Sequence, residues 1–337
     1  MDPQPVTFRP IGFVENGFPF GTKGDTLRAA ESCIVLDPEF APGFGSEARL
    51  NRFPFFFVRP LERRNGMNAL VLATIPLLAS LGSVVEGAAQ FEPSLQGTVT
   101  LTVLYDNTAV DERLGIGWGF AVLLETPDQT VLFDTGADGE ALLENFRLLG
   151  KDPMAVDAIV ISHAHGDHTQ GLQALFDLGL RPRLYLLSAF PQEMREEIAR
   201  NSEMVEAFPG QEIVPGIRTT GQVGTTIPEQ ALILDTQAGT VVLTGCAHPG
   251  VILMVERAQE LSSGPLDLVM GGFHLMEATA EELQDILGEF RRLGVQRVGA
   301  THCSGDLTIT TFQGAYGEDF QPLGAGRVLR FLLPSSA

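Results

Sequence analysis

The stretch that most constrains what this chain can fold into is residues 157–172, which read DAIVISHAHGDHTQGL. It opens with an apolar run at 158–161, which is typical of a strand buried inside a parallel sheet. Four polar side chains follow, His163, His165, Asp167 and His168. Their spacing would not place them on one face of a helix. They therefore belong to a loop that leaves the end of a strand. Imidazole and carboxylate groups so close together suit a borderline metal ion such as zinc.

The other histidines of the chain, His248, His274 and His302, each follow an apolar run as well. These runs, with their histidines, read TVVLTGCAH, LVMGGFH and VGATH. Open α/β sheets place their ligands just beyond the carboxyl ends of the strands. We therefore expect every histidine of the sequence to lie at a strand end rather than in a helix or a surface loop.

The composition argues against some classes of function. Aspartate and glutamate outnumber lysine and arginine by 42 to 22, and the net charge of −20 disfavours nucleic acid as a partner. For the same reason, a phosphorylated substrate would need local help from metal ions. The three cysteines, Cys33, Cys246 and Cys303, do not make a disulfide framework, and the last two stand beside histidines.

Strands and one amphipathic helix are expected before the histidine loop, at 98–105, 120–125, 130–133 and 139–149. After the loop, residues 188–230 predict a long polar excursion that contains an exposed helix at 191–207. Insertions of this kind usually cover the mouth of an active site.

The pattern His-x-His-x-Asp-His at 163–168 resembles the signature of the metallo-β-lactamase superfamily. The resemblance implies an α/β fold, a four-layer αββα sandwich, over residues 98–337. It also implies two metal positions, one with His163, His165 and His248, the other with Asp167, His168 and His302. In the superfamily an aspartate that matches Asp134 braces the loop of ligands. The alternative is that Asp134 caps the helix at 139–149.

The sequences around the later histidines resemble one branch of this superfamily, the 7,8-dihydropterin-6-methyl-4-(β-D-ribofuranosyl)aminobenzene 5′-phosphate synthases. They read GCAHPG, GGFHL and THCSG. Where the superfamily often has a bridging aspartate, this chain has Cys246, which would bridge the ions or stand beside them. His274 is expected to be either a metal ligand or a donor to a substrate phosphate. The branch tends to have a histidine near Trp118, which this chain lacks.

The resemblance implies an enzyme with one or two divalent metal ions, expected to be zinc. It would be a hydrolase that uses a metal-bound water against a small phosphoester or related substrate, with Asp167 and His274 taking part in catalysis. The alternative is a synthase-type transferase that expels pyrophosphate. A binding protein with a degenerate site is disfavoured, because all the histidines are retained.

Residues 7–58 resemble a different family, the TsaA-like tRNA adenine-N6 methyltransferases, which form a small β-barrel. The motifs that carry this resemblance are RPIG at 9–12, LDPEF at 36–40 and an aromatic strand near Phe55. The later part of such a domain is missing, so residues 1–60 are interpreted as a partial β-rich segment without catalysis. The alternative is an unrelated arm rich in proline and phenylalanine.

Residues 61–97 are interpreted as a signal- or anchor-like segment with a linker. Arg63 and Arg64 precede an uncharged stretch at 67–85, and small residues follow it. At 19 residues the stretch would also just span a bilayer, and a buried helix is the alternative. The protein is therefore expected to be exported or membrane-anchored if residues 67–89 act as a signal, and cytoplasmic otherwise.

Overall fold

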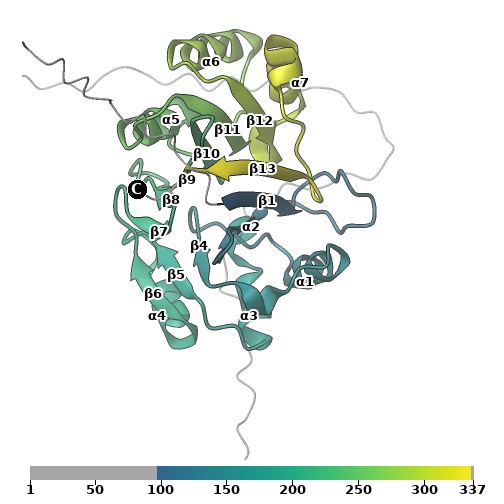
Figure 1. Cartoon of the computed structure of the whole chain (residues 1–337), viewed down its shortest axis with the longest axis vertical. Coiled ribbons are helices and arrows are strands. Elements are labelled where there is room, and N and C mark those ends of the chain that lie inside the picture. The colour runs from purple at the N-terminus through teal and green to yellow at the C-terminus, as the bar shows by residue number, and fades with distance from the viewer. Residues whose placement is uncertain (1–96, 335–337) are drawn as a thin grey trace, which may run out of the picture. The chain divides into compact units, whose positions relative to one another are not determined.

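The computed structural model describes residues 97–334, in which two β-sheets lie face to face between two layers of helices (Figure 1). Within these residues the first sheet has seven strands, in the order β13 (Val328–Leu333), β1 (Gly97–Tyr105), β2 (Ala121–Glu125), β3 (Thr130–Phe133), β4 (Ala158–Val160), β5 (Arg183–Leu186) and β6 (Glu203–Glu206). The second has six, in the order β12 (Arg297–Thr301), β11 (Leu266–Gly272), β10 (Thr240–Thr244), β9 (Leu232–Asp235), β8 (Ile217–Thr219) and β7 (Glu212–Val214).

Each sheet is antiparallel on one side and parallel on the other. In the first sheet β13, β1, β2 and β3 pair antiparallel, whereas β3, β4, β5 and β6 pair in parallel. In the second sheet β7 to β10 pair antiparallel, and β10, β11 and β12 pair in parallel. Parallel neighbours end at the same edge of a sheet, so the loops after β3 and β4 lie together, as do those after β10, β11 and β12.

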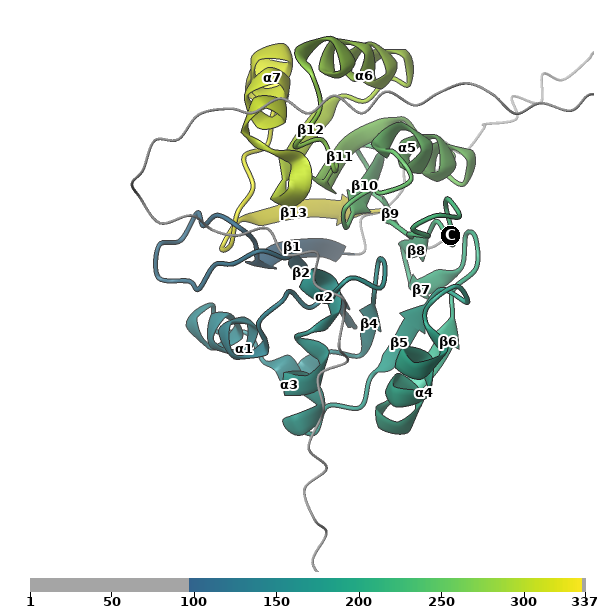
Figure 2. The ribbon, with the colours of Figure 1, turned by 180° about the vertical axis from the view of Figure 1, so that it is seen from behind.

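Helices cover the outer face of each sheet (Figures 1 and 2). Those on the first sheet are α1 (Gly139–Leu148), α3 (Leu172–Asp177) and α4 (Gln192–Asn201), and the short α2 (Gly166–Thr169) lies in the histidine loop. Those on the second sheet are α5 (Val251–Glu260), α6 (Ala280–Arg292) and α7 (Asp306–Tyr316). The described residues also contain three short 3-10 helices, η1 (Pro153–Ala155), η2 (His302–Ser304) and η3 (Gly317–Asp319). The predicted four-layer αββα sandwich is confirmed.

The main apolar core lies between the two sheets. Val103 and Phe133 of the first sheet belong to the same buried cluster as Leu243 and Met270 of the second. Every residue of β4 and of β10 is buried, because the other sheet covers one face and helices cover the other. This double cover explains why β4 and the middle of β10 are apolar runs and do not alternate with polar residues. The core thereby fixes the strand ends from which the histidine loops leave.

The prediction for residues 188–230 is wrong in part. The helix α4 is exposed as expected, but it ends at Asn201, because Glu203–Glu206 forms β6 and pairs in parallel with β5. The chain then continues into β7 and β8. The strands β6, β7 and β8 within this segment therefore extend the edges of the two sheets.

Two of the sequence predictions concern residues that the structure does not describe. The methyltransferase-like segment at 7–58 and the signal-like segment at 67–89 both lie outside residues 97–334. Between residues 97 and 334, no helix has the length and apolar character needed to cross a membrane. The domain boundary near residue 98 and the membrane contact stay predictions.

Asn145, buried in α1, ties this helix to two other segments. Its side-chain nitrogen donates to the carbonyls of Leu104 and Gly115 at 2.8 and 2.7 Å, and its oxygen accepts from the Gly115 N–H at 2.8 Å. Asn145→Ala should lower the free energy of unfolding by about 1–3 kcal/mol, because these backbone groups lose their partners. Urea denaturation measures the change, with the exposed neighbour Glu144→Ala as the control that stays close to wild type. An Asn145→Ala protein as stable as wild type would contradict this account.

Candidate metal centre

Loops at the ends of four strands bring all six histidines of the chain into one cluster, and a fifth loop adds Asp134. The ring centroid of each histidine lies between 4.2 and 5.1 Å from that of another histidine. The loops follow β3, β4, β10, β11 and β12, and they carry Asp134, His163, His165, Asp167, His168, Cys246, His248, His274 and His302. The residues predicted from the sequence are thus placed side by side, although they are far apart in the chain.

A short chain of hydrogen bonds fixes the proton on His163. The Ser162 hydroxyl donates to Asp134 Oδ2 at 2.7 Å, so its oxygen is left to accept from His163 Nδ1 at 2.9 Å. His163 therefore carries its proton on Nδ1 and turns the lone pair of Nε2 into the cluster. Burial, together with the neighbouring histidines, lowers the pKa of His163 well below its usual range, so the ring is neutral.

Two further ring nitrogens face the lone pair of His163. His165 Nδ1 lies 3.1 Å from His163 Nε2, and His248 Nε2 lies 3.2 Å from it. Burial lowers the pKa of His165, and burial with the neighbouring histidines lowers that of His248 to about 3, so both rings are neutral at pH 7. One lone pair cannot accept from both rings at once. A cation among the three nitrogens satisfies all of them, and this donor set fits a divalent metal ion.

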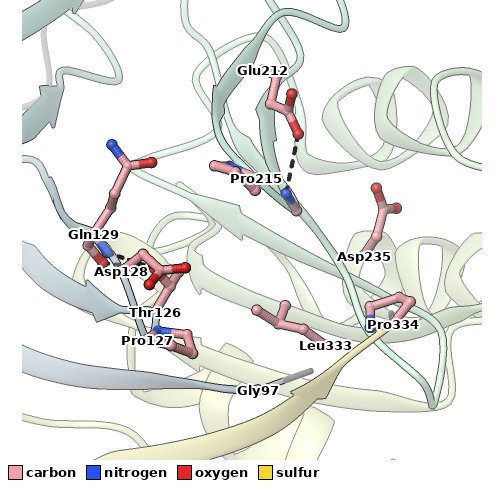
Figure 3. Close-up of a pocket in the computed structure, with 11 residues that line it drawn as sticks. Gly97, Thr126, Pro127, Asp128, Gln129, Glu212, Pro215, Asp235, Leu333 and Pro334 are labelled. Atoms are coloured by element: carbon pink, nitrogen blue, oxygen red, sulfur yellow. Dashed lines mark hydrogen bonds between the residues drawn. The ribbon is translucent and has the colours of Figure 1, made fainter. Parts of the chain in front are cut away.

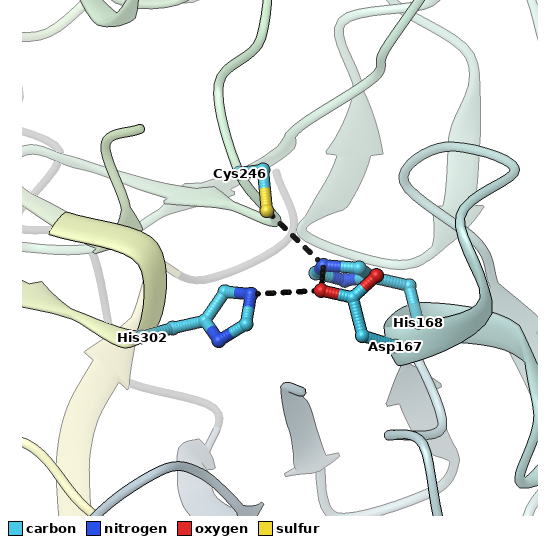
Figure 4. A group of neighbouring side chains, drawn as sticks. All are labelled: Asp167, His168, Cys246 and His302. Carbon is cyan, nitrogen blue, oxygen red and sulfur yellow. Dashed lines mark hydrogen bonds and ion pairs between the residues drawn. The ribbon is translucent and has the colours of Figure 1, made fainter. Parts of the chain in front are cut away.

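His168 lies where the histidine loop meets the loop after β10 (Figure 4). Its Nδ1 is 2.6 Å from Asp134 Oδ2, and its Nε2 is 3.2 Å from Cys246 Sγ and 3.5 Å from Asp167 Oδ2. Burial lowers the pKa of His168, but the Asp134 carboxylate outweighs burial and raises it to about 10. A cation would replace the second proton that this ring holds. Asp134 therefore braces the histidine loop, and the residue that caps α1 is Asp138.

Asn107, just after β1, orients His302. Its side-chain nitrogen donates to the His302 carbonyl at 3.1 Å, so its Oδ1 faces His302 Nδ1 at 3.0 Å as an acceptor. His302 thus carries its proton on Nδ1 and directs Nε2 toward Asp167 Oδ2, 3.3 Å away (Figure 4). This Nε2 is buried and makes no hydrogen bond with any of the described residues. A buried imidazole lone pair of this kind is the arrangement that a metal ligand requires.

Glu229 holds the loop that carries Cys246 and His248. Its carboxylate accepts from the backbone N–H groups of Cys246 and Ala247 at 2.8 Å and of His248 at 2.9 Å. The side chain is fully buried, and burial raises the pKa of Glu229 to about 7. Sequence reasoning missed Glu229, because it is a single glutamate within a polar stretch, and it missed Asn107, whose only signal is its place at a strand end.

His274 and Cys303 lie beside the cluster. The ring of His274 is exposed on one side and lies 4.2 Å from that of His248. The buried Cys303 thiol donates to the Cys246 carbonyl at 3.6 Å. Burial raises the pKa of Cys303, but its contacts with Cys246 and His274 outweigh burial and lower it to about 5. His274 thus stands within reach of two sulfur atoms and of solvent.

Backbone strain is concentrated in these loops. Among residues 97–334, the non-glycine residues with positive φ are Asp134, Ala247, His274 and His302, at values between 52 and 59°. For residues with a β-carbon this conformation costs about 1–2 kcal/mol each. Three of the four were predicted as site residues, and the fourth stands between Cys246 and His248. Strain that persists at such a cluster indicates that the surrounding structure holds these side chains in place.

Four groups of donor atoms have all their members within 4.8 Å of one another. They are Asp167–His168–Cys246–His302, His163–Cys246–His248, His163–His165–Asp167 and Cys246–His274–Cys303. The first two groups agree with the expected division into two metal positions, and Cys246 belongs to both. The third group places Asp167 of one position beside His163 and His165 of the other. The described residues therefore contain a His/Asp/Cys cluster that is able to hold divalent cations.

A separate pocket lies between the turn after β2 and the hairpin of β7 and β8 (Figure 3). Its volume is about 370 Å³, and its lining includes Asp128, Glu212 and Asp235. The Glu212 carboxylate accepts from the Gly216 N–H at 3.2 Å, and Asp235 pairs with Arg218 at 2.8 Å. None of the predicted site residues lines this pocket, so the chemistry belongs to the histidine cluster.

Comparisons with known proteins agree with this geometry. Residues 115–256 match the family model described as the metallo-beta-lactamase superfamily. The 7,8-dihydropterin-6-methyl-4-(beta-D-ribofuranosyl)-aminobenzene-5'-phosphate synthase of Methanocaldococcus jannaschii is 26% identical, over 63% of this chain and 90% of that protein. Among solved structures, Tm1679, a metal-dependent hydrolase of the beta-lactamase superfamily, is 27% identical with a TM-score of 0.58, over 68% of this chain and 98% of that one. A diphosphatase from the PhnP family shares the fold at 18% identity and a TM-score of 0.50, over 70% of this chain and 98% of that one. The predicted resemblance to the metallo-β-lactamase superfamily is confirmed by the match at residues 115–256, which holds the histidine loop and the loop of Cys246 and His248, and the protein is an enzyme.

Proposed function

We propose that this enzyme is a metal-dependent hydrolase of a small phosphorylated substrate, and that it holds two divalent cations. The observation that carries the proposal is the convergence of ring nitrogens of His163, His248 and His302 around the Cys246 sulfur. His163, His165 and His248 would hold one ion. Asp167, His168 and His302 would hold the other, with Cys246 between the two.

The donor set favours zinc. Imidazole nitrogen, carboxylate oxygen and cysteine sulfur are all zinc ligands, whereas magnesium and calcium take oxygen ligands almost alone. When bound, such ions lower the pKa of water and polarise a phosphoryl oxygen. They also offset the negative charge of the chain, which is −20 overall, at the place where an anionic substrate would bind.

The residues of the chain have separate tasks in this proposal. Asp134 keeps the proton of His168 on Nδ1, and Asn107 does the same for His302, so each ring offers Nε2. Asp167 stands next to His302 and keeps 17% of its side chain exposed, so it is placed to take a proton from an incoming nucleophile. Trp118 is 49% exposed with its ring 5.1 Å from that of His302, which suits it to contact the substrate.

The alternative function is a synthase-type transferase that expels pyrophosphate. The observation in its favour is the archaeal relative named as a synthase, which the chain matches over 90% of that protein's length. Metal-loaded protein should be tested in parallel against phosphoesters and against a dihydropterin pyrophosphate with an aryl amine. Phosphoester hydrolysis without amine-dependent release of pyrophosphate supports the hydrolase. Release of pyrophosphate only when the amine is present rejects it in favour of the transferase.

Removing one ligand should remove one metal position. His163→Ala should lower the bound zinc by one ion per chain and abolish turnover, and His302→Ala should do the same through the other position. Elemental analysis of the dialysed proteins gives the zinc content, and Gln170→Ala, an exposed residue of the same loop, is the control. If His163→Ala keeps both the wild-type zinc content and the wild-type rate, the assignment of His163 is wrong.

The tautomer of His302 should depend on Asn107. Asn107→Leu removes the acceptor of the Nδ1 proton, so zinc affinity or turnover should fall about 10–100-fold, as is usual for groups that orient metal ligands. Asn107→Asp keeps an acceptor at this position and should retain more of both than Asn107→Leu does. Competition with a chromogenic chelator measures the affinity. Equal losses in the two variants would show that the amide does not act through His302.

A further inference from the structure

A second kind of donor group adjoins the proposed two-metal site. The sulfur atoms of Cys246 and Cys303 and a ring nitrogen of His274 all lie within 4.8 Å of one another. They come from the loops after β10, β12 and β11, which are neighbouring strands of one sheet. His274 and Cys303 are not needed by either of the metal positions proposed above, so their proximity to Cys246 calls for a separate explanation.

The backbone around these atoms is built for close approach. Gly272 lies between the two cysteines, and a β-carbon there would come within 2.7 Å of Cys303 Sγ and 3.2 Å of the Cys246 Cα. The Gly272 N–H donates to the Gly245 carbonyl at 3.1 Å, which holds the start of the Cys246 loop against β11. His274 is then turned toward the sulfur atoms by a φ of 52°. Only glycine at position 272 lets both thiols reach the same place.

The chemistry of the group is that of a soft metal site. Two cysteine sulfurs and one imidazole are the protein ligands of an open, three-ligand zinc site, which leaves a fourth position for another molecule. Thiolates favour zinc, cadmium or copper(I) over magnesium, calcium and manganese. Both cysteines are 2% exposed, whereas His274 is exposed and lines a pocket of about 460 Å³. The site would therefore be dry on the sulfur side and open to solvent on the imidazole side.

We propose that Cys246, His274 and Cys303 form a distinct, thiolate-rich site for a soft metal ion, which binds independently of His163 and His302. Both sulfurs would bind as thiolates, and a proton still held by Cys246 or Cys303 would pass to solvent. The assignment makes His274 a metal ligand rather than a donor to a substrate phosphate. It goes beyond the proposed function: although it shares Cys246 with the two-metal site, it needs none of the other ligands on which hydrolysis would depend.

Cadmium titration of the full, metal-depleted chain tests the site, because cadmium–thiolate bonds absorb in the near ultraviolet and report the sulfur ligands directly. In the double variant His163→Ala/His302→Ala, one cadmium ion per chain should still bind with the absorbance of two thiolates. Adding Cys303→Ser to this variant should remove about half of that absorbance, since one of two sulfur ligands is lost. Adding Cys33→Ser instead removes a cysteine outside the proposed site and should change nothing.

The proposal is overturned if the double variant binds no cadmium, or if Cys303→Ser leaves the absorbance unchanged. Should the double variant fail to fold, single Cys303→Ser and Cys33→Ser variants of the wild-type chain give the same comparison. There too, an unchanged absorbance in Cys303→Ser overturns the proposal. Zinc content and turnover of the wild type distinguish the two proposals. If both persist while the cadmium result is negative, only the thiolate site falls; if only the thiolate site fills, the two-metal hydrolase falls.

Discussion

The carboxylate of Asp134 is the contact on which the rest of the site depends. It is buried at the end of β3, where it accepts from the Ser162 backbone at 2.7 Å, from the Ser162 hydroxyl and from His168. Through the hydroxyl it also sets the tautomer of His163. One side chain therefore decides which nitrogens of His163 and His168 face the cluster, and the positive φ of Asp134 is the strain that this position costs.

The ligands that follow strands of the second sheet are also held by hydrogen bonds to a few polar side chains. Glu229 holds the loop of Cys246 and His248 by accepting from three successive backbone N–H groups, and Asn107 holds His302. These partners arrive from distant parts of the chain and meet the ligands only because the two sheets pack face to face. The apolar core between the sheets thus has a chemical consequence, since it sets the distance between the loops of the first sheet and those of the second.

Much of this arrangement could be predicted from the sequence. The apolar runs before His163, His248, His274 and His302 predicted that these histidines follow strand ends, and these four do so. His168 departs from the expectation, because the short helix α2 already begins at Gly166. The division of the donors follows from their order in the chain and from the superfamily pattern. What could not be predicted depends on tertiary packing. The strands at 203–206 and 212–214 are short and polar, so their pairing with the edges of the sheets leaves no periodic signal.

The partners of the ligands were missed for a related reason. An isolated Glu229 or Asn107 looks like any polar surface residue, and only the fold shows that each faces a backbone loop or a ring nitrogen.

Diffraction from crystals of the purified, zinc-loaded chain, with data collected on both sides of the zinc absorption edge, tests the central claim most directly. The account predicts anomalous peaks about 2.0–2.3 Å from the nitrogens of His163 and His248 and from those of His168 and His302. A difference map with no peak at either place would contradict it.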